Sequence, residues 1–256
     1  MTRLNICLLF TMSFIPVYIL IGCRSNPESK LNIAVAANMQ YAIEDLVADF
    51  TGRTKIECNV ILGSSGKLLA QITEGAPYDL FISADEKYPA ELFTRGLTIN
   101  IPAIYAFGQL VLICGDSTWK SVDQVNFTRI EKFALANAKT APYGKAAEDA
   151  INYFRWNEQL QNKKVYGESI SQTNLFIMTG SAEMGLTSQS LVFSDKLESN
   201  PNFILIPAES YSPLAQAAVI LDSSQRKEDA AQFFNYLLSP EARAILKKFG
   251  YLVPES

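Results

Sequence analysis

Small polar residues stand at three points in the sequence where a strand-like run gives way to a helical pattern. The three turns read VAANMQYA, which contains Asn38, GSSGK, which contains Ser64 and Ser65, and TAPYGKAA, which contains Tyr143. The first turn of a helix carries unpaired N–H groups and about half a positive charge, so it attracts anions. These turns have the right chemistry to bind an anion through neutral donors.

Each turn taken alone also fits an ordinary helix cap. GSSGK is not a phosphate-binding Walker loop, because Lys67 is followed by Leu68 and the glycine spacing differs. An exported hydrolase that uses Ser65 with Lys67 is a remote alternative. It has little support, because the chain contains no histidine to activate a serine and GSSGK does not match the GxSxG pattern.

The composition is that of a well-packed globular protein. The chain has 256 residues, of which 48% are hydrophobic and 19% charged, and its formal net charge is −4. There is no long basic run, so nucleic acid is not an expected partner. Neither a CxxC pair nor a zinc pattern occurs in the sequence, and we expect no cofactor.

The N-terminus resembles a bacterial lipoprotein signal. Arg3 precedes an apolar run over residues 4–21, and the run ends in Leu-Ile-Gly followed by Cys23. This pattern predicts a signal peptide over residues 1–22, a lipid on Cys23 and a polar tether over residues 23–30. An uncleaved membrane anchor is the alternative. In both cases the rest of the chain is exported and held at a membrane surface, in the periplasm or on the outer face of the cell membrane.

Two cysteines, Cys58 and Cys114, remain outside the signal region, each in an apolar strand-like run. An exported protein could join them in a disulfide. Two buried thiols are equally compatible with the sequence, which gives no distance between them.

Apolar strand-like runs alternate with helical patterns along the chain, which predicts an α/β fold with largely parallel sheets. The chain ends in two helices, of which the second begins with Ser239 as its cap and Pro240 in its first turn. The predicted strands cover residues 31–36, 58–62, 79–84, 109–114, 133–136, 164–169, 184–187, 203–206 and 216–221.

Four segments, in this order and at these intervals, resemble the substrate-binding proteins of molybdate ABC transporters. They read AVAANMQYAIEDL, GSSGKLLAQITEGAPYDLFISADEK, APYGKAAEDAI and SPEARAILKKFGYLVP, and the resemblance runs from about Leu31 to Pro254. It implies the type II periplasmic-binding-protein fold, which has two α/β lobes around a ligand cleft. It also implies that molybdate or tungstate binds there, that an ABC transporter permease is the partner, and that there is no catalysis.

The resemblance also implies a set of ligand-binding positions. One family position near residue 188 usually holds a tyrosine, so whether Ser188 or Gln189 touches the ligand is open. The implied binding residues are Asn38 with Ala37, Ser65 with Ser64, Tyr143 and Ile170 through their main chains, and Ser188 as a further candidate.

We therefore expect the first lobe to comprise residues 31–108 and 215–256, and the second lobe residues 109–214, in a protein that is a monomer. A binding protein for another tetrahedral oxyanion, such as sulfate or phosphate, is an alternative. A purely structural or adhesive lipoprotein is another.

Overall fold

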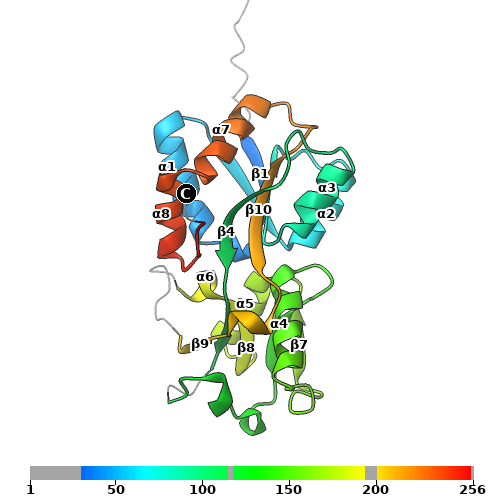
Figure 1. Ribbon diagram of the computed structural model, residues 1–256, viewed down its shortest axis with the longest axis vertical. Helices are drawn as coiled ribbons and strands as arrows, with labels where there is room; N and C mark the ends of the chain where they lie inside the picture. Colours follow the sequence, from blue (N-terminus) through cyan, green and yellow to red (C-terminus); the bar gives the residue numbers. More distant parts are fainter. Residues whose placement is uncertain (1–29, 115–117, 194–200, 255–256) are drawn as a thin grey trace, which may run out of the picture.

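The computed structural model describes residues 30–114, 118–193 and 201–254. The predicted signal peptide, Cys23 and nearly all of the predicted tether lie outside these residues. Figure 1 shows two α/β lobes stacked along the long axis of the molecule, with β4 and β10 running along the middle toward the lower lobe. The α/β class and the two-lobe fold predicted from the sequence are confirmed.

The first lobe is built on a five-stranded sheet with the order β2-β1-β3-β10-β4. Strand β1 is parallel to β2 and β3, and β10 is antiparallel to β3 and β4. Strands β1, β3 and β10 are apolar and almost entirely buried, with helices on both faces of the sheet, as expected of strands inside a largely parallel sheet. The edge strand β2 has no buried residue. The strands are β1 Leu31–Ala36, β2 Cys58–Gly63, β3 Leu80–Ser83, β4 Ala103–Gly108 and β10 Leu214–Ile220.

The helices of the first lobe include the last two of the chain, which pack against α1 and β10. Phe50 of α1 meets Phe233 of α7 edge to face, with ring centroids 4.8 Å apart. Ser239 caps α8, because its Oγ accepts a hydrogen bond from the Ala242 N–H. The helical elements are η1 Ala37–Met39, α1 Ala42–Thr54, α2 Ser65–Thr73, α3 Lys87–Thr94, α7 Lys227–Leu237 and α8 Pro240–Lys248.

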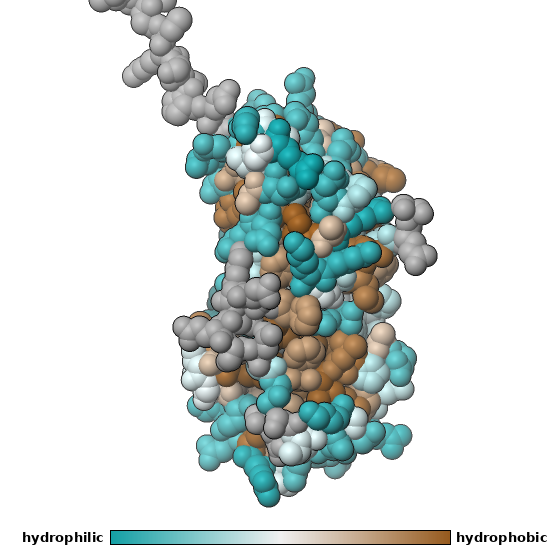
Figure 2. Space-filling view, turned by 90° about the vertical axis from the view of Figure 1, so that its left-hand side faces the viewer, coloured by the Kyte–Doolittle hydropathy of each residue, from teal (hydrophilic) through white to brown (hydrophobic). Residues whose placement is uncertain are grey.

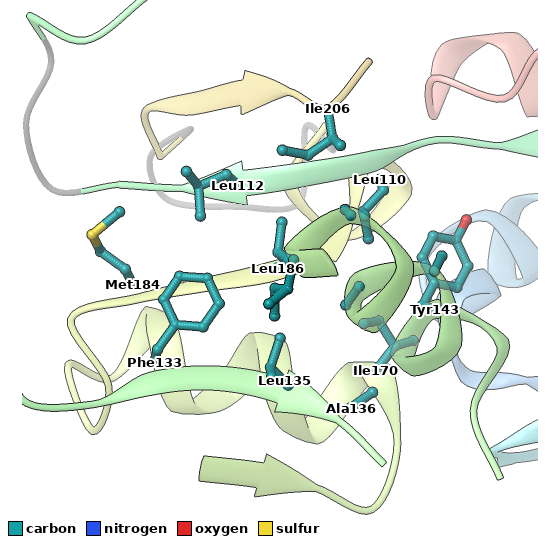
Figure 3. Packing of buried hydrophobic residues seen from close by; sticks show 14 of the residues in the cluster. Leu110, Leu112, Phe133, Leu135, Ala136, Tyr143, Ile170, Met184, Leu186 and Ile206 are labelled. Atoms are coloured by element: carbon teal, nitrogen blue, oxygen red, sulfur yellow. The ribbon is translucent and has the colours of Figure 1, made fainter. Parts of the chain in front are cut away.

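The second lobe has a sheet with the order β7-β6-β8-β5-β9, in which β6 is parallel to β7 and β8 while β5 is antiparallel to β8 and β9. Figure 3 shows its core, where Phe133, Leu135 and Leu186 pack beneath Leu110 and Leu112. The strands and α-helices are β5 Leu110–Ile113, β6 Phe133–Ala136, α4 Pro142–Tyr153, β7 Lys164–Gly167, α5 Ile170–Met178, β8 Met184–Ser188, α6 Gln189–Val192 and β9 Phe203–Leu205. Short 3-10 helices cover Val122–Gln124, Phe127–Arg129 and Ala208–Ser210.

The chain crosses between the lobes beside β4 and β10. Strand β4 ends at Gly108, and β5 begins two residues later at Leu110. Strand β10 returns the chain to the first lobe, with an irregularity in its pairing to β4 between Gln216 and Ala217. On the face drawn in Figure 2, hydrophilic side chains dominate the upper lobe. Apolar side chains gather around the waist and on the adjoining part of the lower lobe, whose far end is again hydrophilic.

Within the described ranges, no helix combines the length and the apolar character needed to cross a bilayer. The two described cysteines, Cys58 and Cys114, lie in different lobes and are not bonded to each other.

Candidate ligand-binding site

A small cavity lies between the lobes, where the carboxyl ends of strands from both sheets face each other. Its volume is about 10 Å³, far below the ~300–1,000 Å³ of pockets for drug-sized ligands. Such a space excludes an organic solute and leaves a small inorganic ion as the ligand to consider. The lining residues are Ala36, Ala37, Asn38, Ser64, Ser65, Ala84, Ala141, Pro142, Tyr143 and Ile170.

The first lobe brings two hydroxyl groups to the cavity at the start of α2. Ser65 is fully buried, and its Oγ accepts a hydrogen bond from the Ala84 N–H at 3.0 Å. The hydroxyl proton of Ser65 is therefore the group that it can offer to a ligand. Ser64 precedes the helix, and its buried Oγ caps no N–H and has no partner among the described residues. An unpaired buried hydroxyl is costly, so a ligand that accepts a hydrogen bond would stabilise it.

The second lobe brings the starts of two helices to the cavity. Helix α4 begins at Pro142, and Tyr143 follows in its first turn. Helix α5 begins at Ile170, and the Ser169 Oγ that caps it accepts from the Gln172 N–H. The N–H groups of a first turn have no partner within their own helix. The side chains of Pro142 and Ile170 are apolar, so this side of the cavity offers main-chain donors and closes out water.

Asn38 lines the cavity, but its side-chain donors are used elsewhere. The Asn38 Nδ2 donates to Gln216 Oε1 at 2.8 Å and to the Tyr251 hydroxyl at 2.7 Å. The Gln216 amide is itself oriented, because its Nε2 donates to the carbonyls of Ala84 and Leu214. The Asn38 Oδ1 is left buried without a partner among the described residues. Asn38 was predicted to contact the ligand. Because its side-chain N–H groups are engaged within the protein, its main-chain N–H is the donor that it could offer.

Two serines of the second lobe fix the peptide units of η1. Ser171 Oγ donates to the Ala37 carbonyl and Ser190 Oγ donates to the Asn38 carbonyl, each at 2.8 Å. In a trans peptide the C=O and the following N–H point in opposite directions. The bond from Ser171 therefore fixes the direction of the Asn38 N–H. Sequence reasoning missed both serines, since each lies one residue beyond a predicted contact and only the fold brings it to η1.

Tyr143 reaches beyond the cavity with its side chain. Figure 3 shows its hydroxyl pointing away from the core of the second lobe. The side chains of Ser188 and Asn38 lie near this hydroxyl, but it has no hydrogen bond of normal geometry within the described part of the chain. Burial, reinforced by the nearby Tyr251, raises the pKa of the Tyr143 phenol well above its usual value.

The sequence left open whether Ser188 or Gln189 touches the ligand. Neither of them is among the residues that line the cavity. Ser188 is fully buried at the end of β8, where its Oγ and the Ser190 Oγ are 2.6 Å apart. It therefore supports Ser190 one layer behind the cavity. Gln189 begins α6 and packs against Gly250 near the C-terminus.

Among the described residues, none with a charged side chain lines the cavity. Lys67 lies at the mouth of the cleft, where its Nζ pairs with Glu168 Oε2 of the other lobe at 2.6 Å. Lys67 is thus engaged at the mouth, while the Ser65 Oγ bonds to the Ala84 N–H, so the hydrolase alternative has no Ser65–Lys67 pair. The described ranges also contain no cluster of acidic residues and cysteines that could hold a metal cation.

The arrangement can bind a small anion and enclose it. Helices α2, α4 and α5 and the turn η1 begin around one cavity, and each start carries partial positive charge and unpaired N–H groups. Two serine hydroxyls add further donors.

Comparisons with known proteins agree with this chemistry. A family model described as bacterial extracellular solute-binding protein matches residues 31–252. The molybdate-binding protein ModA of Rhodobacter capsulatus is 35% identical over 223 residues, which is 86% of this chain and 86% of that protein. The putative ABC transporter substrate-binding lipoprotein YvgL of Bacillus subtilis is 28% identical over 90% of this chain and 92% of its own length. The solved structure of the periplasmic molybdate-binding protein of Azotobacter vinelandii superposes with a TM-score of 0.80 at 30% identity, covering 88% of this chain and 100% of that one.

Proposed function

The chain belongs to the bacterial extracellular solute-binding proteins, in the group of the molybdate-binding proteins ModA, and on this premise we propose that it captures molybdate and tungstate outside the cytoplasm and delivers them to an ABC transporter permease. A solute-binding protein of this kind binds and releases its ligand unchanged. Its ligand is therefore cargo, and the protein is not an enzyme.

The choice of ligand rests on one observation. A small cavity between the lobes is surrounded by helix starts and serine hydroxyls, and no charged side chain of the described residues lines it. Neutral donors can hold a dianion, because hydrogen bonds to a charged acceptor contribute about 1.5–3 kcal/mol each. We assign donor roles to the Ser64 and Ser65 hydroxyls and to the main-chain N–H groups of Asn38, Tyr143 and Ile170. Ala37 forms the wall beside them.

Selectivity follows from fixed donors. Tungstate matches molybdate in charge and size, so it should bind with similar affinity. Sulfate has the same charge but is smaller, and fixed donors cannot all reach it. Losing two contacts would cost about 3–6 kcal/mol, which weakens binding by about 10²–10⁴.

The test is a calorimetric titration of the protein with molybdate, tungstate, sulfate and phosphate. We expect molybdate and tungstate to bind within tenfold of each other and sulfate to bind at least a hundredfold more weakly. Sulfate binding within tenfold of molybdate would show that the ligand is another tetrahedral oxyanion. No saturable binding of any of the four would remove the proposal.

We also propose that Cys23 carries a lipid that holds a monomer at the membrane. The support is the Leu-Ile-Gly-Cys pattern after an apolar run and the likeness to a relative described as a lipoprotein. Cys23→Ser should move the protein from the membrane fraction to the soluble fraction. If it stays with the membrane, residues 1–22 serve as an uncleaved anchor.

A further inference from the structure

Two glycines of the first lobe lie where atoms of the second lobe fill the space that a side chain would need. A Cβ on Gly66 would lie 2.9 Å from the Thr140 Cα and 3.0 Å from the Thr140 carbonyl oxygen, and also 2.9 Å from the hydroxyl of Tyr88 in its own lobe. A Cβ on Gly108 would lie 2.0 Å from the Tyr143 hydroxyl oxygen and 3.0 Å from the Tyr143 Cζ. Ordinary contacts of a Cβ are 3.4–4 Å, so neither position can hold a methyl group with the lobes as they are.

Backbone conformation does not explain either glycine. Gly66 lies in the first turn of α2 and Gly108 at the end of β4, and neither has a positive φ. Any residue can adopt these conformations. Each position therefore needs the absence of a side chain. Part of the space is taken by the opposite lobe, namely by Thr140 at Gly66 and by Tyr143 at Gly108, and the rest by the Tyr88 hydroxyl and the Gln216 amide of the first lobe.

Both glycines meet the same short segment, residues 140–143, which leads into α4. The Gly66 N–H donates to the Thr140 carbonyl at 2.8 Å, a hydrogen bond between the lobes. Three residues later, the Tyr143 hydroxyl lies over Gly108 beside the Gln216 amide. Residues 141–143 of this segment line the anion cavity. The position of residues 140–143 against the two glycines thus decides how close the second-lobe donors come to the first-lobe serines.

We propose that Gly66 and Gly108 are positioning residues that set how far the two lobes close on the ligand. This proposal rests on the proposed function for its ligand. A methyl group at either position would hold residues 140–143 away from the first lobe. The donors of the two lobes would then no longer reach one small anion together, although the donors themselves are unchanged.

The test compares Gly66→Ala and Gly108→Ala with Gly52→Ala. Gly52 is a matched control, because it lies in α1 with ordinary φ and a Cβ there meets nothing within 4 Å. Molybdate affinity is measured by calorimetry, and lobe closure by the change in radius of gyration in small-angle X-ray scattering when molybdate is added. We expect each of the two variants to lose at least about tenfold in affinity, or 1.4 kcal/mol, and to contract less than the parent. Gly52→Ala should match the parent in both.

A second pair of measurements identifies the contact. Tyr143→Phe removes the hydroxyl that a Cβ at Gly108 would strike, but it leaves the Thr140 backbone that a Cβ at Gly66 would strike. Gly108→Ala should therefore cost less affinity in the Tyr143→Phe background than in the parent, by at least about threefold. The cost of Gly66→Ala should fall less than that of Gly108→Ala, since the Thr140 backbone that a Cβ at Gly66 would strike is unchanged.

Parental affinity and contraction in both glycine variants would overturn the proposal, as would an equal cost of Gly108→Ala in the two tyrosine backgrounds. Thermal unfolding is used to check that each variant is folded. If Gly108→Ala does not fold, the comparison of Gly66→Ala with Gly52→Ala tests the proposal. If the parent binds no oxyanion, the proposed function fails. A crystal structure of Gly108→Ala then decides the inference: an undisplaced Tyr143 hydroxyl with unchanged lobes would overturn it.

Discussion

The two lobes share one sheet arrangement but supply different chemistry to the site. In each, three parallel strands are followed by an antiparallel strand and an edge strand: β2-β1-β3 with β10 and β4 in the first lobe, and β7-β6-β8 with β5 and β9 in the second. Apart from Ala84, which follows β3, the cavity residues lie at the ends of equivalent strands, namely β1 and β2 in the first lobe and β6 and β7 in the second.

The difference lies in the side chains at these equivalent turns. The first lobe places an amide and two hydroxyls there, while the second places Ala141, Pro142, Tyr143 and Ile170. A helix start presents N–H groups whatever its side chains are. The second lobe can therefore bind through its main chain and use its side chains as walls. Mutations should reveal this difference in ligand affinity, because replacing a side chain removes a hydrogen-bond donor to the ligand only in the first lobe.

Ser65→Ala should have the largest effect, because it acts on both binding and stability. It removes a donor to the anion, worth about 1.5–3 kcal/mol of affinity, and leaves the buried Ala84 N–H unpaired at a cost of about 1–3 kcal/mol of stability. Calorimetry and urea unfolding measure the two terms. Ser64→Ala is the matched control, since its Oγ has no partner to lose, and it should weaken binding without lowering stability. Parental affinity in Ser65→Ala would remove its assigned role.

Ile170→Pro tests the main-chain role of the second lobe. Proline at the first helical position removes the N–H and suits the helix, and Ser169 has the extended backbone that a following proline requires, with φ −138° and ψ 166°. Ile170→Ala is the control, because it loses the side chain but keeps the donor. We expect the proline variant to bind molybdate about 1.5–3 kcal/mol more weakly than the alanine variant. Equal affinities of the two variants would rule out an Ile170 N–H contact.

Lys67 and Glu168 link the two lobes at the mouth, and breaking their ion pair should have a small effect. Both side chains are largely exposed, and such pairs contribute about 0.2–1 kcal/mol. Lys67→Met and Glu168→Gln, alone and combined, should each change molybdate affinity by less than about fivefold, with the difference shrinking at high salt. A loss of a hundredfold in Lys67→Met alone would mean that Lys67 contacts the ligand directly.

Between pH 6 and 9 the affinity for molybdate should not change measurably. Tyr143 is the only titratable residue among the described cavity residues, and burial raises the pKa of its phenol above the usual value near 10. Ionisation would add negative charge and weaken anion binding, but a raised pKa places this loss above the tested range. Titrations at pH 6, 7.5 and 9 check this. A tenfold change within the range would point to an ionisable group in the site.

The sequence contained enough to predict the α/β class, most strands and the turns that meet at the cavity. Asn38, Ser64 and Ser65 stand out as polar residues directly after apolar runs, so their turns could be found without a structure. Tyr143 and Ile170 could be placed only through the family resemblance, because a main-chain donor leaves no mark in the residue type. The roles of all these residues toward the ligand remain predictions.

Other features depend on contacts that no local pattern reveals. Gln216 looks like an ordinary interruption of an apolar strand, yet it bonds to Asn38, 178 residues away, at the irregularity in β10. Strand β4 was not predicted, because it is an edge strand whose residues alternate poorly between buried and exposed. The spaces at Gly66 and Gly108 exist only once both lobes are assembled.

The strand order of the first lobe also has a consequence for how the chain folds. Strand β10 pairs with both β3 and β4, and it is the last strand of that sheet along the chain. A chain made from its N-terminus therefore carries β3 and β4 for a long time before the strand that joins them exists, whereas the second lobe is contiguous and has all its strands by residue 205. Pairing distant segments is slow and leaves strand edges exposed meanwhile. The second lobe should thus reach its native state first, and β4 should be the segment most exposed to chaperones and proteases until residues 214–220 arrive.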